Sequence, residues 1–564
     1  MRSIPLAFAA VLLVALCARA QELTIYRNAT IYTGSKENPR AEAMSVRQGR
    51  VIGIGGLDEV RTTIRRGEAA REIDLEERVV LPGIIDAHGH MAGLGAFGLG
   101  VLELSSARSF EHVVKAAAAA AELKAPGVWV LGGRWDHESW ISKQLPTHAE
   151  LSKAVPDHPV WLRRVDGHAG IANARALELV GIDKNTQSPP GGEILRDASG
   201  QPTGVLVDNA MALIEARIPA SARGRGEDLL LKAQELCLAA GLTGVHDAGI
   251  SPPDIEVYRS LKEDGRLKLR MYLMVSGPYA MKYYDANRPI IDERLTVRAA
   301  KLYMDGAMGS RGAWLFEPYA DRPEDDQGNP YTGLAVNSPE YIEAVARHGL
   351  EKGYQVCTHA IGDRGNAEVL DAYERALRSR PGFADMEHFN HRFRIEHAQL
   401  LRMDDINRFA LWGVIASMQP THCTSDMRWV EDRVGPTRAR GAYAWRTILD
   451  SGAVVAGGSD FPVESHNPFL GFYAAVTRQD LQGNPEGGWM PHQKMTREEA
   501  LHAFTLGAAY ASFEESQKGS LEEGKLADFI VIDRDIMTCD EREIPGTKVL
   551  RTVIGGETVY EASR

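Results

Sequence analysis

Eight short apolar stretches, rich in β-branched residues, recur along this chain, and each is followed by a polar loop and a helix-like segment. They lie at residues 79–90, 241–249, 267–276, 298–307, 354–363, 393–400, 414–422 and 453–463. Strands that alternate with helices in this way are typical of a parallel sheet covered by helices, and eight repeats predict an α/β fold of the (β/α)8 barrel type. Nearly all of the stretches end in His, Asp, Glu or Ser. Because barrel enzymes build their sites from the C-terminal ends of the strands, these polar residues are predicted to meet in one site.

Both ends of the chain carry segments in which apolar residues alternate with polar residues and glycines. These segments are residues 22–34 and 43–55 near the start, and residues 526–533 and 548–560 near the end. The alternation predicts short antiparallel strands. We therefore expect a composite β-sandwich formed by both termini, from residues 21–80 and 516–564, next to a barrel made by residues 81–104 and 231–515.

One connection is too long for a loop. About 150 residues separate the first two candidate strands, and they include an alanine-rich tract near 116–121 and segments rich in Trp, Gly and Pro. A structureless loop of that length is not expected inside a compact domain. Residues 105–230 are therefore predicted to form an insert, or lid subdomain, after the first barrel strand.

The N-terminus has the pattern of a cleavable export signal. Arg2 is followed by an almost uninterrupted apolar run from Ile4 to Ala18, and the small residues Ala18 and Ala20 flank Arg19. The run is shorter than the roughly 20 apolar residues that span a bilayer, although a membrane anchor is the alternative interpretation. We expect residues 1–20 to be a signal peptide, Gln21 to be the first mature residue, and the protein to be secreted or periplasmic.

Net charge and motif context exclude several classes of site. The formal net charge is −12 at pH 7 and no basic block stands out, so nucleic acid is not an expected partner. The glycine-rich stretches at 51–56 and 132–136 lack the strand–GxGxxG–helix context of a dinucleotide site. Cysteines beyond the leader have no CxxC spacing, which predicts buried free thiols. They are Cys237, Cys357, Cys423 and Cys539.

Five polar side chains at the predicted strand ends have the character of metal ligands. His88 and His90 follow an apolar run, and residues two apart on a strand face the same side, so both imidazoles can point at one ion. His359, His397 and Asp460 end three later stretches. Imidazole and carboxylate together suit zinc and related divalent ions. An HxH pair alone is weak evidence, but the whole set predicts a metal centre.

Lys301 is the unusual member of the set, because it occupies a predicted inward position on the fourth strand. An unpaired ammonium group is costly to bury, and nearby cations would raise that cost. A neutral lysine amine can take up carbon dioxide to form a carbamate, whose oxygens are able to bridge two metal ions. The alternative is a structural salt bridge, for which Asp305 is the candidate partner.

The ordered motifs of the chain resemble those of a known family. The matching text is LPGIIDAHGH, VDGHAGIANARAL, GGEILRD, GLTGVHDAG, KLYMDGAMGSRGA, THAIGD, RIEHAQ, GGSDFPV, MTREEAL and KGSLEEGKLADFIVID. This series is similar to the amidohydrolase superfamily and, in detail, to amidohydrolase family 3, the YtcJ-like branch. The resemblance covers nearly the whole mature chain, and it implies a barrel with a composite β-sandwich and an insert after the first strand.

The resemblance also implies the ligand roles. His88 and His90 would hold the more buried of two divalent ions, His359 and His397 the other, with a carboxylated Lys301 as the bridge and Asp460 on the buried ion and the reacting water. Zinc is the expected metal, with manganese or cobalt as alternatives. The implied reaction is hydrolysis of a carbon–nitrogen bond in a small-molecule amide, of non-peptide or N-acyl type, by metal-activated hydroxide. Asp460 would act as general base and then as acid.

Two rival functions stay open at this point. One is a deaminase or cyclic-amide hydrolase on the same barrel, in which a single metal is an option that Lys301 disfavours. The other is a non-catalytic binding protein, which would be expected to have lost ligands, whereas all six expected residue types are present here. The substrate is not readable from the sequence, and a homodimer is possible because dimers are common among such barrels.

Further candidates are assigned to the surroundings of the metal centre. His168, in the insert, is predicted to contact substrate or stabilise an oxyanion, with a structural role as the alternative. Arg311, after the fourth strand, is a candidate for binding a substrate carboxylate or carbonyl.

Three more polar residues have two interpretations each. His246 either contacts the cavity or bonds to Asp247. His422 either lines the pocket or is an ordinary loop histidine. Asp363 either orients a ligand histidine or caps the following helix.

Overall fold

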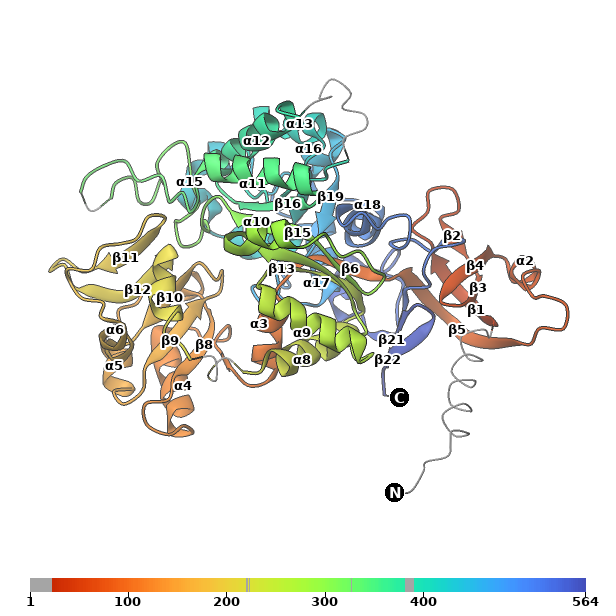
Figure 1. Ribbon diagram of the computed structural model, residues 1–564, viewed down its shortest axis with the longest axis horizontal. Coiled ribbons are helices and arrows are strands. Elements are labelled where there is room, and N and C mark those ends of the chain that lie inside the picture. Colours follow the sequence, from red (N-terminus) through yellow and green to blue (C-terminus); the bar gives the residue numbers. More distant parts are fainter. Residues whose placement is uncertain (1–22, 220–221, 223, 326, 381–389, 564) are drawn as a thin grey trace.

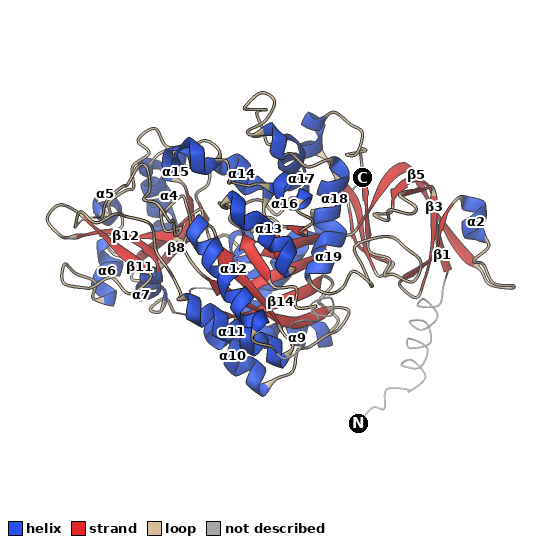
Figure 2. Cartoon of the chain, turned by 90° about the horizontal axis from the view of Figure 1, so that it is seen from above, coloured by secondary structure: helices blue, strands red, loops and turns tan. Residues whose placement is uncertain are grey.

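The computed structural model describes residues 23–219, 222, 224–325, 327–380 and 390–563. The predicted signal peptide lies outside these residues. Three parts follow one another along the long axis of the molecule: the insert, the barrel and a sheet made by the two termini (Figure 1). The same order is seen from above (Figure 2). Within the described residues, no helix combines the length and apolar composition needed to cross a membrane.

The central part is a barrel of eight parallel strands, which confirms the predicted fold class. In spatial order they are β6 (Ile84–Gly89), β13 (Leu242–Ile250), β14 (Arg270–Ser276), β15 (Leu295–Tyr303), β16 (Gln355–Ala360), β17 (Arg394–His397), β18 (Ile415–Met418) and β19 (Val455–Gly457). A parallel bridge between Gly89 and Phe461 connects the first strand to the segment after the last. Each strand is one of the eight apolar stretches of the sequence, and their interior faces are buried as in other barrels of this type.

Helices cover the outside of the barrel between successive strands. They are α3 (Met91–Gly98), α8 (Gly226–Ala239), α9 (Pro252–Glu263), α10 (Gly277–Ala286), α11 (Pro339–Lys352), α12 (Asp363–Arg378), α13 (Met403–Trp412), α14 (Pro420–Asp426), α15 (Val430–Ala439), α16 (Trp445–Asp450), α17 (Pro468–Thr477), α18 (Arg497–His502) and α19 (Ala508–Ala511). Local sequence sets their ends. Helix α11 begins after Ser338, whose side chain accepts from the backbone N–H of Tyr341, and ends at Gly353 in the left-handed conformation.

The insert after the first strand is a folded unit of its own. Six strands pair in the order β11 (Gly192–Arg196), β12 (Pro202–Asp208), β10 (Ala169–Ala172), β9 (Val160–Arg164), β8 (Val130–Trp135) and β7 (Leu102–Glu103). Its helices are α4 (Phe110–Glu122), α5 (Ala149–Ala154), α6 (Ala174–Val180) and α7 (Ala212–Glu215). The tryptophans Trp135 and Trp140 stack within its core, 6.0 Å between ring centroids. The long connection therefore has a packed core of its own.

Both termini form one eight-stranded sheet. The N-terminal strands are β1 (Leu23–Tyr32), β2 (Arg40–Ala41), β3 (Ala43–Arg47), β4 (Arg50–Gly55) and β5 (Ala70–Pro82), with the short helix α2 (Leu57–Arg61); the C-terminal strands are β20 (Phe529–Ile532), β21 (Val549–Ile554) and β22 (Glu557–Glu561). One pairing differs from the expected antiparallel pattern, because β1 and β5 are parallel. The β3–β4 hairpin and α2 lie between these strands in sequence, and they supply the long crossover that a parallel pair requires.

A buried ion pair joins the barrel to this sheet. Arg270, the first residue of β14, donates from Nε and Nη2 to the two carboxylate oxygens of Asp528, at 2.6 and 2.9 Å. Asp528 immediately precedes β20 and also accepts from the backbone N–H of Gly555 at 2.7 Å. Burial alone would raise the pKa of Asp528, but the charge and hydrogen bonds of Arg270 outweigh it and lower that pKa below its usual value.

Replacing Asp528 is therefore expected to destabilise the fold. Asp528→Asn leaves the Arg270 guanidinium buried without its counter-charge, and such a change costs about 3–5 kcal/mol. Because the pKa of Asp528 is lowered in the folded state, its contribution is fully present above about pH 4 and is lost as the pH falls through the folded pKa. Urea unfolding followed by circular dichroism at pH 7 and at pH 3 checks both points.

The matched control is Glu256→Gln, which removes an exposed i,i+3 pair with Arg259 on α9. Exposed pairs contribute about 0–1 kcal/mol, so its urea midpoint should stay close to that of the unmodified protein. Equal midpoints for Asp528→Asn and the control would contradict a structural role for the buried pair.

Candidate metal centre

Three of the predicted ligands lie where β6 contacts the segment after β19, residues 458–461; we call this contact the seam. Asp86 accepts from the backbone N–H groups of His88 and Ser459, at 3.1 and 3.0 Å, and from the Ser459 hydroxyl at 2.6 Å. The Asp460 N–H then donates to the His88 carbonyl at 2.7 Å. A Cβ at Gly89 would lie 2.5 Å from the Phe461 ring, so only glycine permits this approach. The seam fixes His88 and His90 beside Asp460.

The six predicted ligands converge at the C-terminal ends of the strands. Asp460 Oδ1 lies 3.0 Å from His90 Nε2 and 3.7 Å from His88 Nε2, and Lys301 Nζ lies 3.1 Å from His88 Nε2. The ring of His397 is 4.8 Å from that of His88 and 4.6 Å from that of His359, between centroids. All six side chains are buried except His90, which is partly exposed. Their donor atoms therefore surround one shared space.

The chemistry of these donors fits divalent cations. Asp460 Oδ1 and His422 Nε2 are buried and have no regular hydrogen bond among the described residues, although His90 Nε2 lies 3.0 Å from Asp460 Oδ1. Burial and the charge of Lys301 lower the pKa of His88 to about 4. Burial likewise lowers the pKa values of His359 and His397. Neutral imidazoles and orphaned acceptor atoms are what a metal ion requires.

Asp460 is ionised in this setting. Burial opposes its charge, but His90 and the other imidazoles around it outweigh burial and hold the pKa of the carboxyl well below its usual value. The backbone of Asp460 has φ 59°, and that of His397 has φ 75°, both in the left-handed region that non-glycine residues rarely adopt. Such conformations cost about 1–3 kcal/mol each and cluster at functional sites. The fold thus holds two of the candidate ligands in strained positions.

Three residues that the sequence analysis did not single out orient the ligands. Glu396 Oε2 lies 2.5 Å from His88 Nδ1, and Gln419 Oε1 lies 2.8 Å from His397 Nδ1, which fixes the ring nitrogen that faces the shared space. Arg394 Nη2 donates to Glu396 at 3.0 Å and helps to keep the pKa of that buried carboxyl low despite burial. The sequence did carry one signal, because the alternation in β17 puts Arg394 and Glu396 on the same face.

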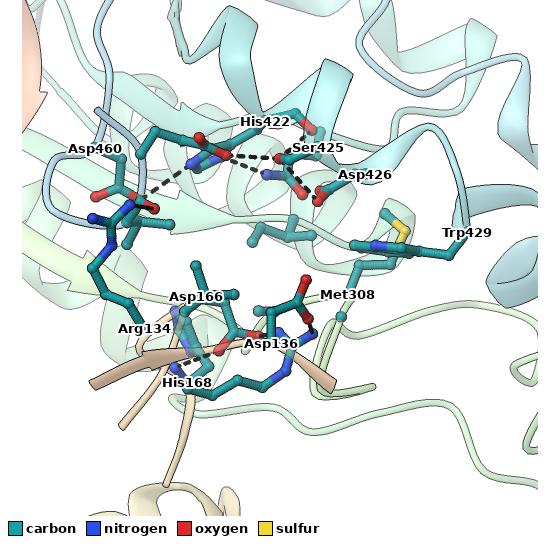
Figure 3. Close-up of a pocket in the computed structure, with 18 of the residues that line it drawn as sticks. Arg134, Asp136, Asp166, His168, Met308, His422, Ser425, Asp426, Trp429 and Asp460 are labelled. Carbon is teal, nitrogen blue, oxygen red and sulfur yellow. Dashed lines mark hydrogen bonds and ion pairs between the residues drawn. The ribbon is translucent and has the colours of Figure 1, made fainter. Parts of the chain in front are cut away.

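The insert contributes a histidine to the centre. His168 lies in the loop before β10, and its ring centroid is 4.7 Å from that of His359. Asp208, at the end of β12, accepts a hydrogen bond from His168, with 2.7 Å between Asp208 Oδ1 and His168 Nδ1. Burial disfavours the charged imidazole, but the hydrogen bond and charge of Asp208 outweigh it and raise the pKa of His168. Figure 3 shows His168 in the wall of the cavity that also contains Asp460 and His422.

Comparison with known proteins agrees with this geometry. The model of a family described as the amidohydrolase family matches residues 71–560. The chain belongs to the amidohydrolase family. It is accordingly a metal-dependent hydrolase of carbon–nitrogen bonds.

Individual relatives span nearly the whole chain. The putative amidohydrolase YtcJ of Bacillus subtilis is 32% identical, with 96% of this chain and 99% of the relative covered. The N-substituted formamide deformylase of Arthrobacter pascens is 30% identical over 95% of this chain and 97% of its own. An uncharacterized metal-dependent hydrolase from Pyrococcus horikoshii superposes with a TM-score of 0.72 at 26% identity, covering 92% of this chain and 99% of that structure.

Within this amidohydrolase, Lys301 is not paired with Asp305. Asp305 accepts from the backbone N–H groups of Trp314, Ile361 and Gly362, at 2.8, 3.0 and 2.8 Å. Burial raises the pKa of Asp305 to about 7. Among the ion pairs of the described residues, none includes Lys301, so the salt-bridge interpretation is not supported.

Arg311 is placed away from the centre. Its Nε and Nη2 donate to the carboxylate of Asp321, at 3.2 and 2.8 Å, and it does not line the cavities that reach the centre. The predicted role in substrate binding therefore finds no support in the geometry. Arg134 and Arg164 of the insert line both cavities instead.

His246 occupies neither of its two predicted environments. Its Nδ1 lies 3.0 Å from Arg394 Nη1, inside the barrel, and it does not line either cavity. Asp247 instead accepts from the hydroxyl of Tyr258 at 2.6 Å. The partner of His246 comes from β17, which faces β13 across the barrel interior, and local sequence does not reveal this contact.

His422 lies in the cavity wall, and Asp363 lies at the start of a helix. His422, in α14, lines the cavity, with Nε2 3.7 Å from Asp460 Oδ2 and Nδ1 3.0 Å from the side-chain nitrogen of Gln399. Asp363 is the first residue of α12 and accepts from the backbone N–H of Phe316 at 3.0 Å. It therefore anchors the loop after β15 at a helix start and does not orient a ligand histidine.

Proposed function

We propose that this amidohydrolase hydrolyses the carbon–nitrogen bond of a small-molecule amide at a centre of two divalent ions. The observation that supports this most is the convergence of four imidazoles, the Lys301 amine and the Asp460 carboxylate on one space at the strand ends. The residues that would hold the ions are His88, His90, Lys301, His359, His397 and Asp460. Zinc is the proposed metal, with manganese or cobalt as alternatives.

Lys301 is proposed to act as the bridge in its carboxylated form. Lys301 is 1% exposed, and its amine lies beside His88. Among the ion pairs of the described residues, none includes this amine. A carbamate formed with carbon dioxide turns this buried amine into an anionic oxygen donor. Bound ions would lower the pKa of a water molecule and polarise the scissile carbonyl.

Asp460 is proposed to move the proton. Its carboxylate is ionised, is held in strained backbone at the cavity wall, and so accepts the proton of the attacking water and returns it to the leaving nitrogen. His168 faces the same cavity, and Asp208 accepts from its Nδ1 and raises its pKa, so that the protonated ring can donate from Nε2–H to the carbonyl oxygen as negative charge develops. The deformylase from Arthrobacter pascens, which by its name acts on N-substituted formamides, supports a carbon–nitrogen substrate.

The different roles of Asp460 and Lys301 predict that variants at the two positions lose activity in different ways. Asp460→Asn keeps an oxygen donor but removes the proton acceptor, so metal should remain while kcat falls about 10²–10⁴-fold. Lys301→Ala removes the bridge, so metal content should fall from two ions per chain, and propionate should partly restore activity. Elemental analysis and turnover of an amide panel by the zinc- or manganese-loaded protein check this. Normal turnover with full metal content in Lys301→Ala would rule out the binuclear proposal.

The pairing of His168 with Asp208 predicts a non-additive double variant. His168→Asn and Asp208→Asn should each lower kcat about 10–100-fold, with little change in KM, because both remove the same donor to the developing oxyanion. The double variant should be no worse than His168→Asn alone. Independent, additive losses would show that Asp208 does not act through His168, and retained metal content in all three variants is the control.

Export is proposed from the N-terminal sequence. If residues 1–20 are a signal peptide, native protein should be recovered outside the cytoplasm and begin at Gln21. N-terminal sequencing of the native protein checks this, and a sequence that still begins at Met1 would contradict it.

A further inference from the structure

Two cavities of different character meet at the metal centre. One has a volume of about 230 Å³ and the other of about 670 Å³. Both are lined by His168, His359, His397 and Asp460, so each opens on the same reacting groups. An amide has two substituents, one on the carbonyl carbon and one on the nitrogen, and a centre placed between two cavities can receive one in each.

The larger cavity has the more apolar wall of the two, beyond the polar groups that both cavities share. It lies between α3, the insert strands β8 and β9, and the short helix α7, and its walls include Phe97, Leu131, Trp161, Met211, Val336 and Pro462. Two charge pairs in its wall are satisfied internally, since Arg163 pairs with Glu215 at 3.0 Å and Asp208 with His168. Lys301 and Asp460 line the end of this cavity at the metal centre. We call this space the apolar cavity.

The smaller cavity has the more polar wall of the two, and we call it the polar cavity. Arg428 Nη2 pairs with Asp136 at 2.6 Å, and Ser425 donates to Glu464 at 2.7 Å within its wall. Figure 3 shows Asp136, Asp166 and His168 facing His422 and Asp460 across this space, with Trp429 and Met308 at one end. An apolar substituent placed here would desolvate these charged groups without replacing their hydrogen bonds, which is unfavourable.

We propose that the substrate is an amide with two unlike halves, a bulky aliphatic or aromatic group that fills the apolar cavity and a small polar group that fits the polar cavity. This inference rests on the proposed function, because it takes the amide to be cleaved where the two cavities meet. Burial of each added methylene in the apolar cavity should raise kcat/KM about fourfold, which corresponds to ~0.8 kcal/mol.

Two series of amides test the proposal with the metal-loaded enzyme. In N-alkylacetamides the chain on nitrogen lengthens from methyl to octyl, and in N-methylalkanamides the acyl chain lengthens over the same range. One series should gain about fourfold in kcat/KM per methylene until the cavity is filled, and the other should stay flat or decline. The series that gains identifies which half of the substrate enters the apolar cavity. Two flat series, or equal gains in both, would overturn the proposal.

Calorimetry of the products separates this inference from the proposed function. Alkylamines and alkanoates of the same lengths are titrated into the metal-loaded protein, and one of the two sets should bind more tightly with each methylene. If no amide is hydrolysed but one product set shows this gain, the proposed reaction fails while the apolar cavity stands. If amides are hydrolysed and neither product set nor amide series depends on length, the reaction stands and the two-halves inference fails.

A cavity-filling variant ties the effect to this space. Ala212 is an exposed residue of α7 that lines the apolar cavity, and Ala212→Phe should lower the ratio of octyl to methyl kcat/KM at least tenfold. Ala216→Phe is the matched control, because Ala216 is an exposed alanine at the end of the same helix that does not line the cavity. An equal loss in both variants, or none in Ala212→Phe, would overturn the assignment of the long chain to this cavity.

Discussion

The seam between the first barrel strand and the segment after the last one supports the whole centre. A single buried carboxylate, Asp86, binds the backbone of both sides, and the Phe461 ring rests where Gly89 has no side chain. Burial raises the pKa of Asp86 to about 6, so its hydrogen bonds hold a carboxylate that the interior disfavours. Because His88, His90 and Asp460 are within a few residues of these contacts, their relative positions follow from how the barrel closes.

Much of this arrangement was open to prediction from the sequence. The barrel strands were visible because each is a short buried apolar run, and the ligands were visible because a strand end is where the run meets a polar residue. The expectation of an insert, although not of its six strands, rested on the length of one connection. Glu396 could have been found by reading the alternation of β17 together with Arg394, since both must point into the barrel.

Other features depend on contacts that local sequence does not record. Asp208 reaches His168 only because β10 and β12 pair in one register, and Arg394 reaches His246 across the barrel interior. Arg311 pairs with Asp321 in the loop that follows it and does not line the cavities, so its role in substrate binding stays a prediction without support from the geometry. Strand periodicity shows in the sequence which residues lie at strand ends, whereas it carries no information on partners that come from another element.

The sheet built from both termini has a consequence for the order in which the chain acquires structure. Strand β5 pairs on one side with β1, made shortly before it, and on the other with β20, which is made almost last. Until β20 arrives, one edge of β5 presents unpaired backbone groups, the kind of edge that invites association with other chains. Arg270, at the start of β14, likewise has no Asp528 to pair with until the segment that contains β20 is made. Synthesis of β20 is thus the step that covers the open edge of β5 and completes the ion pair between the barrel and this sheet.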